Sequence, residues 1–382
     1  MSIHVILVSQ EPLANGIPVL IERPKAVVGV CTQMAVSNGW DQSLLRFFGR
    51  KGLDFHREEN APDSDLSVVR SWALELLGRI ERDYPDTEIV LNLTGGNKIM
   101  SLGFWEIFKN RASKIIYTDT AHDRIEILAA KDSTSPTISM DSLLNVPDYL
   151  SMQGIDYLEA KSDNVEWREK AKSRFVITRF FGKRAHDLKG FFGTLNGMVG
   201  ANGGTFHYTP GNVWEQALRM IVKAGLARWS PGEKDISFTN VEAARYLGGG
   251  WLEEYAYIEA SQRCFYDVRA NVRVQAVSEG ATVSNELDIV IAHRNRLFIL
   301  ECKTGNLDEN KKSATKPAET LYKLEVLRQK MGGRFSGAFL VMAQDEGQGA
   351  KDRAKNMGAI LLGPQELQKI GDRLTSVLER SS

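Results

Sequence analysis

The chain contains 382 residues, of which 43% are hydrophobic, enough for two or three domains with separate cores. Lysine plus arginine and aspartate plus glutamate both total 48, so no overall charge points to a polyanionic partner, and any such contact must come from local patches. The three cysteines, Cys31, Cys264 and Cys302, lie far apart without a CxxC spacing, which argues against a zinc module or a disulfide framework.

The first residues, MSIHVILVSQ, contain a short apolar run without a basic leader, which indicates a buried strand and not a signal peptide. No stretch of the sequence approaches the about 18 apolar residues of a membrane-spanning helix. We therefore expect a soluble, cytoplasmic protein that has no membrane partner.

The N-terminal third alternates short apolar runs with segments that have apolar residues at helical spacing, such as 65–82. This alternation predicts an α/β fold with a parallel sheet covered by helices on both faces. A hairpin that pairs 114–118 with 124–128 is expected to close one edge of the sheet. The predicted strands are 3–8, 26–31, 53–57, 88–93 and 114–118.

Two loops in the N-terminal third are candidates for ligand binding. Both follow strands, and ligands of parallel sheets bind beyond the carboxyl ends of the strands. One is Ser9-Gln10 after the first strand, and the other is TGGNK at 94–98. Glycines allow close approach of the main chain, a helix N-terminus favours an anion, and Lys98 adds a positive charge. Neither a Walker loop nor a GxGxxG motif is present, and a Gly-Gly turn by itself also suits a purely structural elbow.

LNLTGGNKIMSLGFWE resembles the ligand loop of CARF domains, the sensors of cyclic oligoadenylates in type III CRISPR defence, and VSQEP resembles their opening loop. The resemblance implies a Rossmann-like CARF domain over residues 1–145. Because CARF domains pair about a two-fold axis, the resemblance also implies a homodimer that binds a cyclic oligoadenylate across the two subunits. Cyclic tetra-adenylate is the expected ligand. The implied pocket residues are Ser9, Gln10, Thr94, Gly95, Gly96, Asn97 and Lys98, with Thr32, Gln33, Asp119 and Thr120 as weaker candidates.

The middle of the chain, 146–247, is predicted to be a linker and a small module. Residues 131–142, rich in Ser, Thr and Asp, suit a linker, and glycine-rich 186–206 predicts loops. A helix is predicted at 212–224, and the segment through Phe238 resembles a winged helix. The basic residues of 166–189 suit either contact with a polyphosphate or a solvated helix face.

Residues 285–305, NELDIVIAHRNRLFILECKTG, predict a hairpin with strands at 287–292 and 297–303 and a turn at 293–296. Side chains alternate along a strand, so Glu301 and Lys303 share one face, and the facing strand can bring Asp288 beside them. Two carboxylates and a lysine can hold a divalent cation, polarise a phosphate and prepare a water for attack. The alternative is a half-buried hairpin whose polar face carries charges.

Asp288 followed by Glu301-Cys302-Lys303 resembles the PD-(D/E)xK nuclease signature, with ELD where many members have PD. The resemblance implies Mg²⁺ or Mn²⁺ bound by Asp288, Glu301 and the main-chain carbonyl of Cys302, with Lys303 orienting water or stabilising charge. It also implies an acid on an earlier helix. GGWLEEY supplies Glu254 for that role, with Glu253 as its rival, and Glu286 is a further alternative. Four lysines beyond the hairpin suit either phosphate contact or a solvated helix: Lys311, Lys312, Lys316 and Lys323.

The whole chain resembles the CRISPR ancillary CARF nucleases, with a CARF domain at 1–145, the middle segment at 146–247 and a PD-(D/E)xK α/β domain at 248–382. The resemblance implies a cyclic-oligoadenylate-activated, metal-dependent endonuclease that cleaves DNA, RNA or both as a homodimer. A ligand-responsive regulator that binds nucleic acid through an inactive nuclease fold remains the alternative. Slow ring-opening of the activator by the N-terminal domain is a third possibility.

Overall fold

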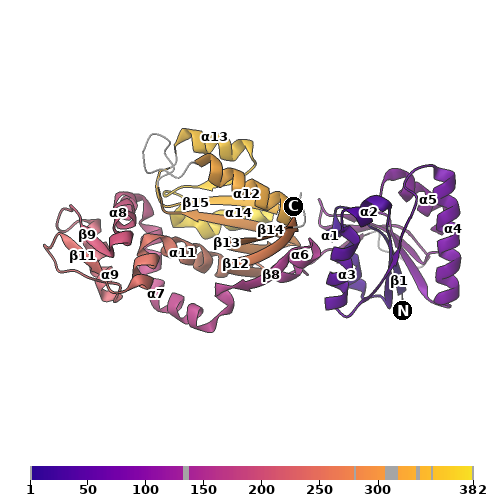
Figure 1. Ribbon diagram of the computed structural model, residues 1–382, viewed down its shortest axis with the longest axis horizontal. Helices are drawn as coiled ribbons and strands as arrows, with labels where there is room; N and C mark the ends of the chain where they lie inside the picture. Colours follow the sequence, from indigo (N-terminus) through magenta and orange to yellow (C-terminus); the bar gives the residue numbers. More distant parts are fainter. Residues whose placement is uncertain are drawn as a thin grey trace. The chain divides into compact units, whose positions relative to one another are not determined.

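The computed structural model describes residues 2–131, 137–278, 281–305, 317–332, 336–345 and 347–380 (Figure 1). The chain divides into two compact units, with the division after Asp156. Within the described ranges, no helix has the length and apolar character needed to cross a membrane.

The N-terminal unit is built on a seven-stranded sheet of order β3-β2-β1-β4-β5-β6-β7. Strands β1 to β5 run parallel, and β6 and β7 add antiparallel strands at one edge. The predicted parallel sheet with a closing hairpin is therefore confirmed. The strands are β1 (Ser2–Leu7), β2 (Ala26–Val30), β3 (Asp54–Glu58), β4 (Glu88–Asn92), β5 (Lys114–Asp119), β6 (Arg124–Ala130) and β7 (Thr137–Ser139).

Helices cover both faces of this sheet. Alternate residues of β1, such as Val5, join a core cluster with residues of α4 and α5, including Phe104. On the opposite face, His4 bonds Glu22 of α1 at 3.0 Å. The chain order reverses between β1 and β4, and this switch point is where parallel α/β sheets bind ligands. The helices are α1 (Pro12–Glu22), α2 (Gln33–Ser37), α3 (Trp40–Arg50), α4 (Leu66–Asp83), α5 (Lys98–Phe108) and α6 (Val146–Met152).

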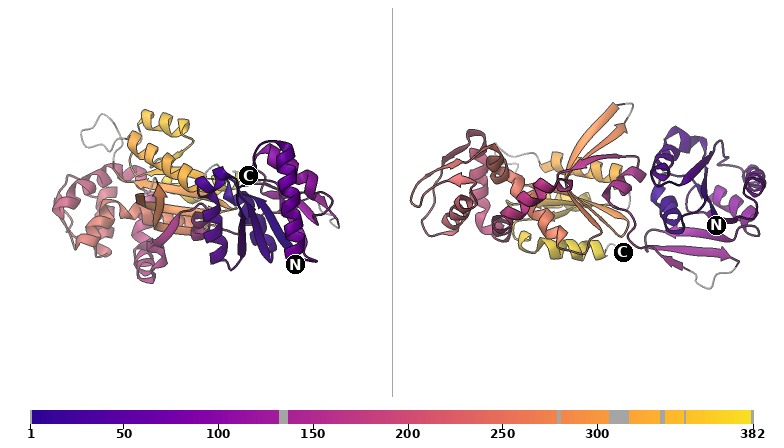
Figure 2. Two further views of the ribbon diagram at one scale, coloured as in Figure 1. Left: turned by 45° about the vertical axis from the view of Figure 1, so that its right-hand side comes forward. Right: turned by 90° about the horizontal axis from the view of Figure 1, so that it is seen from below.

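The C-terminal unit contains a six-stranded mixed sheet of order β16-β15-β14-β13-β12-β8. Strands β12 and β13 form a long antiparallel hairpin that projects beyond the other strands in the right view of Figure 2. β14 lies at the centre of the sheet and is buried almost throughout. The strands are β8 (Asp156–Ala160), β12 (Asp267–Ser278), β13 (Ala281–His293), β14 (Arg296–Lys303), β15 (Ser336–Met342) and β16 (Ile360–Leu362).

The turn between β13 and β14 contains two residues, Arg294 and Asn295, with φ of 49° and 54°. Two successive residues with positive φ are typical of a type I′ turn, whose twist matches that of the strands it joins. The predicted hairpin is confirmed, although its turn is shorter than the four residues expected.

Helices surround this sheet and extend from one end of it. The predicted loops at 186–206 are wrong for most of the segment, because α8 spans Ala185–Met198 and buries Phe191 and Phe192. The helices are α7 (Val165–Lys183), α8, α9 (Val213–Lys223), α10 (Val241–Arg245), α11 (Trp251–Ser261), α12 (Pro317–Gly332), α13 (Gln348–Asn356) and α14 (Ile370–Arg380). Short helical turns occupy Lys161–Asp163 (η1), Val199–Ala201 (η2), Tyr246–Gly250 (η3, π-helical) and Leu367–Lys369 (η5), and a small sheet consists of β9 (Gly203–Thr205), β10 (Ala227–Arg228) and β11 (Asp235–Phe238).

A hydrophobic core joins α7, α8 and α9 to one face of the mixed sheet. Its buried residues extend from Ile177 to Leu378 and include both α8 and the central strands. Trp251 stacks on Phe192 with ring centroids 4.3 Å apart. Residues 157–247 therefore pack together with the mixed sheet, while α6 belongs to the N-terminal unit.

Candidate functional site

The acidic residues of the ECK motif lie where two central strands separate. β13 and β14 pair as far as Ile289 and Leu300, and Asp288 and Glu301 are the next residues on each strand. One carboxylate oxygen of Asp288, Oδ2, accepts a hydrogen bond from the main-chain N–H of Cys302 at 2.7 Å. Lys303 Nζ lies 2.6 Å from Glu301 Oε1. The structure thus brings together the three residues that the sequence singled out.

Burial and charge alter the acidity of this group. Burial, together with the nearby carboxylates of Glu301 and Glu253, raises the pKa of Asp288 to about 7. Burial alone would lower the pKa of Lys303, but the adjacent Glu301 outweighs it and raises the pKa above its usual value. The Cys302 side chain lies in the hydrophobic core, so only its main chain can take part in the site.

The helix acid that faces this group is Glu253. Burial raises the pKa of Glu253, and Glu286 adds to the increase. Asn271 of β12 donates through Nδ2 to Glu253 at 2.7 Å and to Glu286 at 3.4 Å. Asn271 lies opposite Asp288 between two paired positions of the β12–β13 ladder and has a φ of 51°. A left-handed residue inside a strand is strained, and such strain is concentrated at functional sites.

Glu254, the acid that the sequence favoured, faces a different neighbour. Its carboxylate accepts from Arg174 Nη2 at 2.8 Å and from the Thr178 hydroxyl at 2.8 Å. The Arg174 guanidinium also stacks over the ring of Tyr246, 4.6 Å from its centroid. The Glu254 side chain is only 3% exposed, so it forms a buried ion pair that ties α11 to α7.

The start of α11 is fixed against the end of β14. The Thr304 hydroxyl donates to the Gly248 carbonyl at 3.1 Å. Asn196 of α8 and Gln344 beyond β15 both donate to the Thr304 carbonyl, at 3.0 and 2.8 Å. The first of these bonds links the residue after Lys303 to Gly248, which precedes GGWLEEY, and so it helps to position Glu253 relative to Glu301.

The donor set suits a hard divalent cation. Carboxylate oxygens and a main-chain carbonyl are ligands that Mg²⁺ and Mn²⁺ prefer, and burial, followed by the neighbouring carboxylates of Glu301 and Glu253, disfavours the charged form of Asp288 when no cation is bound. Within the described ranges, no group of three or more His, Cys, Asp or Glu side chains is arranged to hold a metal by itself. Mg²⁺ usually takes one or two carboxylates and completes its shell with water and substrate phosphate, and the pair of Asp288 and Glu301 fits that number of carboxylates. Of the predicted lysines, Lys311, Lys312 and Lys316 lie outside the described residues.

In the N-terminal unit, the predicted ligand loop is pressed against the end of β1. A Cβ at Gly95 would collide with the main-chain carbonyl oxygen of Leu7, so only glycine fits there. Gly96 has a φ of 68°, in the left-handed region that favours glycine. Asn97 caps α5 by accepting from the Met100 N–H at 3.0 Å. The loop therefore leads directly into the N-terminus of α5, as expected.

A buried polar network, which the sequence analysis missed, supports this loop. Asn92, 0% exposed, accepts from both the N–H and the hydroxyl of Thr94, at 3.0 and 2.6 Å. Thr94 in turn accepts from the Thr118 N–H at 2.6 Å. Asn15 donates to the Leu7 carbonyl at 2.8 Å and so satisfies the group against which Gly95 packs. Polar groups of β4 and β5, together with Asn15 of α1, thus fix one loop.

The solvent side of the loop is open to a ligand. Gln10, Gly96, Asn97 and Lys98 are exposed, and Ser9 is half-buried. The weaker candidates have local roles: Thr32 caps α2, and Asp119 bonds His122 at 2.7 Å.

Two family models match the chain. The first, described as the Card1 CARF domain, matches residues 3–149. The second, described as Card1-like, endonuclease domain, matches residues 240–380, which include Glu253, Glu254, Glu286, Asp288 and Glu301. The chain is a CARF endonuclease of the Card1 family. A comparison with curated proteins finds no match.

Three solved structures are similar in fold to this Card1-type chain over nearly its whole length. Protein VC1899 from Vibrio cholerae has a TM-score of 0.84 at 22% identity, over 100% of this chain and 99% of its own. Can2 from Sulfobacillus thermosulfidooxidans, in complex with cyclic tetra-adenylate, has a TM-score of 0.77 at 22% identity, over 98% and 96%. A type III CRISPR defence DNA nuclease activated by cyclic oligoadenylate has a TM-score of 0.54 at 16% identity, over 97% of this chain and 51% of its own.

Proposed function

We propose that this CARF endonuclease is switched on by a cyclic oligoadenylate and then hydrolyses phosphodiester bonds of DNA, RNA or both with a divalent cation. The observation that carries the proposal is the cluster of Asp288, Glu301 and Lys303 at the point where β13 and β14 separate, in a domain of an endonuclease family. Glu253, not Glu254, completes the acidic set in this proposal, because Glu254 is engaged with Arg174.

Asp288, Glu301 and the main-chain carbonyl of Cys302 would hold Mg²⁺ or Mn²⁺. When bound, the cation supplies positive charge to the phosphate and increases the acidity of a water. Lys303 remains protonated because Glu301 raises its pKa, so its ammonium group stabilises negative charge that develops on the phosphate and orients the attacking water. The Cys302 N–H holds Asp288 in one rotamer. Glu253, itself held by Asn271, orients solvent at the same centre.

The activator would bind at the loop formed by Ser9, Gln10 and residues 94–98, with the N–H groups at the start of α5 and Lys98 facing its phosphates. The Can2 complex supports cyclic tetra-adenylate as the ring. A cyclic ligand with repeated units suits a two-fold pair of loops, so we propose a homodimer whose shared pocket biases the endonuclease units toward activity. The protein would act in the cytoplasm, where CRISPR effectors encounter foreign nucleic acid.

The test is cleavage of labelled single- and double-stranded DNA and RNA by the full chain, with cyclic tri-, tetra- or hexa-adenylate and with Mn²⁺ or EDTA. We expect cleavage only with one ring size and with Mn²⁺, and at least a hundredfold loss in Glu301→Gln and Lys303→Met. Full activity of both variants would overturn the assignment. Metal-independent binding of a duplex without any cleavage would favour the regulator with an inactive nuclease fold.

A further inference from the structure

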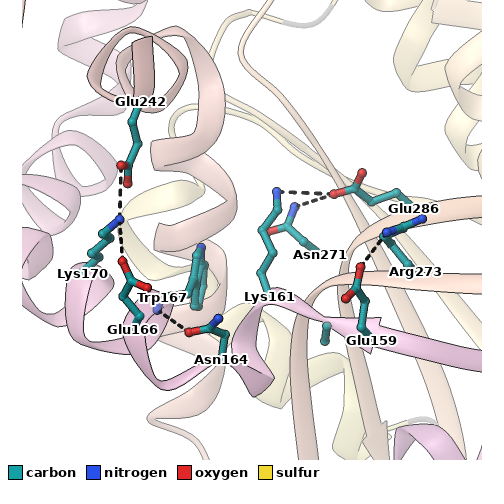
Figure 3. Close-up of a pocket in the computed structure, with 11 residues that line it drawn as sticks. Glu159, Lys161, Asn164, Glu166, Trp167, Lys170, Glu242, Asn271, Arg273 and Glu286 are labelled. Carbon is teal, nitrogen blue, oxygen red and sulfur yellow. Dashed lines mark hydrogen bonds and ion pairs between the residues drawn. The ribbon is translucent and has the colours of Figure 1, made fainter. Parts of the chain in front are cut away.

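A cavity of about 470 Å³ opens directly beside the candidate active site. Side chains from the first turns of α7 line one wall, and side chains from β8, η1, β12 and β13 line the other (Figure 3). Two lining residues, Asn271 and Glu286, also belong to the acidic group around Glu253. A molecule in this cavity would therefore lie next to the phosphodiester that the enzyme attacks.

The charges of the cavity are unsuited to a phosphate. Its wall contains three cationic side chains and four carboxylates, a balance of 3 − 4 = −1. Each cation already has a carboxylate partner within 3.5 Å: Arg273–Glu159 at 2.6 Å, Lys170–Glu166 at 3.2 Å and Lys161–Glu286 at 3.5 Å. An anion entering here would meet paired cations and a net negative wall, so the occupant should be neutral.

The remaining lining groups suit a flat, hydrogen-bonding molecule. The Trp167 indole stands in the cavity wall and is held edge-on to the Tyr257 ring, with centroids 5.3 Å apart. Asn164 lies beside it and accepts the Trp167 main-chain N–H through Oδ1 at 3.2 Å, which leaves its Nδ2 to face a ligand. Asn271 lies across from it and donates through Nδ2 to Glu253, which leaves its Oδ1. An aromatic ring with nearby amide groups is how proteins bind unstacked nucleobases, because the ring stacks and the amides pair with the base edge.

We infer that this cavity receives one base of a single-stranded substrate, the base adjacent to the scissile phosphate, with Trp167 as its stacking platform. The inference rests on the proposed nuclease function and extends it, because a base can enter only when it is not paired in a duplex. DNA and RNA share this chemistry.

The test is a double-mutant cycle that combines Trp167→Ala with removal of the base from the substrate. Wild type and Trp167→Ala are assayed with cyclic tetra-adenylate and Mn²⁺ on single-stranded DNA and RNA oligonucleotides that carry either a normal or an abasic residue beside the cut. Removing the base should slow the wild type by about 5- to 150-fold, the range for one stacked base. Trp167→Ala should lose the same factor on the normal strand and nothing further on the abasic one. Trp167→Phe should regain most of the rate, and Val165→Ala, exposed on the same turn, should match the wild type.

A binding measurement separates this inference from the proposed function. An oligonucleotide with 2-aminopurine at the same position, mixed with protein in EDTA, should change its fluorescence at least twofold with wild type but not with Trp167→Ala. This result would support the cavity even if no metal gave cleavage, an outcome that would overturn only the nuclease proposal. Three results would overturn the base-binding cavity. One is equal cleavage of normal and abasic strands by the wild type, and another is a rate loss from Trp167→Ala that multiplies the rate loss from base removal. The third is an equal fluorescence change with wild type and Trp167→Ala.

Discussion

Replacing Asp288 by asparagine should make the metal-free protein more stable at pH 8. Burial and the carboxylates of Glu301 and Glu253 raise the pKa of Asp288 to about 7, so folding forces a charge into a place that disfavours it. Asparagine has the same shape, and its carbonyl oxygen can still accept the hydrogen bond of the Cys302 N–H. The variant therefore removes a charge with little change in packing.

The sign and size of the effect follow from proton linkage. Below about pH 4, Asp288 is protonated in both the folded and the unfolded chain, and its charge does not affect stability. Between about pH 4 and 7, the folded state holds a proton that the unfolded state releases, so the free energy of unfolding falls as pH rises. The difference between about 7 and the usual 3.8 corresponds to at most about 4 kcal/mol above pH 7, and less where Glu253 takes up the proton instead.

The assay is urea unfolding of full-length wild type and Asp288→Asn in EDTA at pH 4.5 and pH 8, followed through the transition of the C-terminal unit. We expect the variant to be more stable by about 2–4 kcal/mol at pH 8 and by less than about 1 kcal/mol at pH 4.5. Mn²⁺ should stabilise the wild type at pH 8 and act weakly on the variant, since a bound cation neutralises the same charge. A variant that is equally or less stable than wild type at pH 8, or a gain that is the same at both pH values, would refute the reasoning.

Three further predictions test the neighbours of this group. Glu253→Gln should lose activity without a fall in melting temperature, whereas Glu254→Ala should lose about 3 kcal/mol in urea unfolding because it leaves Arg174 with only the exposed Glu242, 3.5 Å away, as an ionic partner; the reverse pattern would restore Glu254 as the helix acid. Asn271→Gly should keep its stability, since glycine accepts a φ of 51°, but should lower cleavage or apparent Mn²⁺ affinity about 10- to 100-fold; unchanged kinetics would refute its positioning role. Gly95→Ala should destabilise the N-terminal unit by at least about 3 kcal/mol and abolish the binding of cyclic tetra-adenylate, measured by calorimetry. The control Gly49→Ala has open space around the new methyl group, so it should change neither stability nor binding.

The arrangement of the strands could be predicted because it follows from the spacing of apolar residues along the sequence. Apolar runs that alternate with helical segments predicted the parallel N-terminal sheet, and the alternation in 285–305 placed Glu301 and Lys303 on one face. The helix α8 was missed because its glycines outweighed its stripe of Leu188, Phe191, Phe192 and Leu195, although that spacing is helical. In the fold, Gly190 and Gly193 are the points where α8 approaches Trp214 and Gln344. Those glycines serve close packing, which a local pattern cannot distinguish from a loop.

The polar partners could not be predicted in this way. Asn92 and Asn271 carry no signal in the sequence, because each is fixed by a contact that only the folded chain creates: Asn92 donates to the Ala14 carbonyl at 2.9 Å, and Asn271 donates to Glu253 at 2.7 Å. Asn92 supports Thr94 from the end of β4, and Asn271 reaches Glu253 from a neighbouring strand. The basic strip of 166–189 shows the same limit: Arg174 and Arg179 bind the buried carboxylates of Glu254 and Glu259.

The choice between Glu253 and Glu254 shows why the helix acid was hard to assign. Consecutive residues of a helix point about 100° apart, so Glu253 and Glu254 cannot both point at Asp288, and the motif alone does not fix the rotation of the helix. Two contacts distant in sequence fix it here. Arg174 of α7 binds Glu254, and Thr304, next to Lys303, binds the Gly248 carbonyl in η3, directly before α11. These two contacts lie on either side of Glu253 in the sequence, and with both in place Glu253 faces Asp288. The rotation of α11 therefore depends on Thr304, which directly follows the strand that carries Glu301 and Lys303.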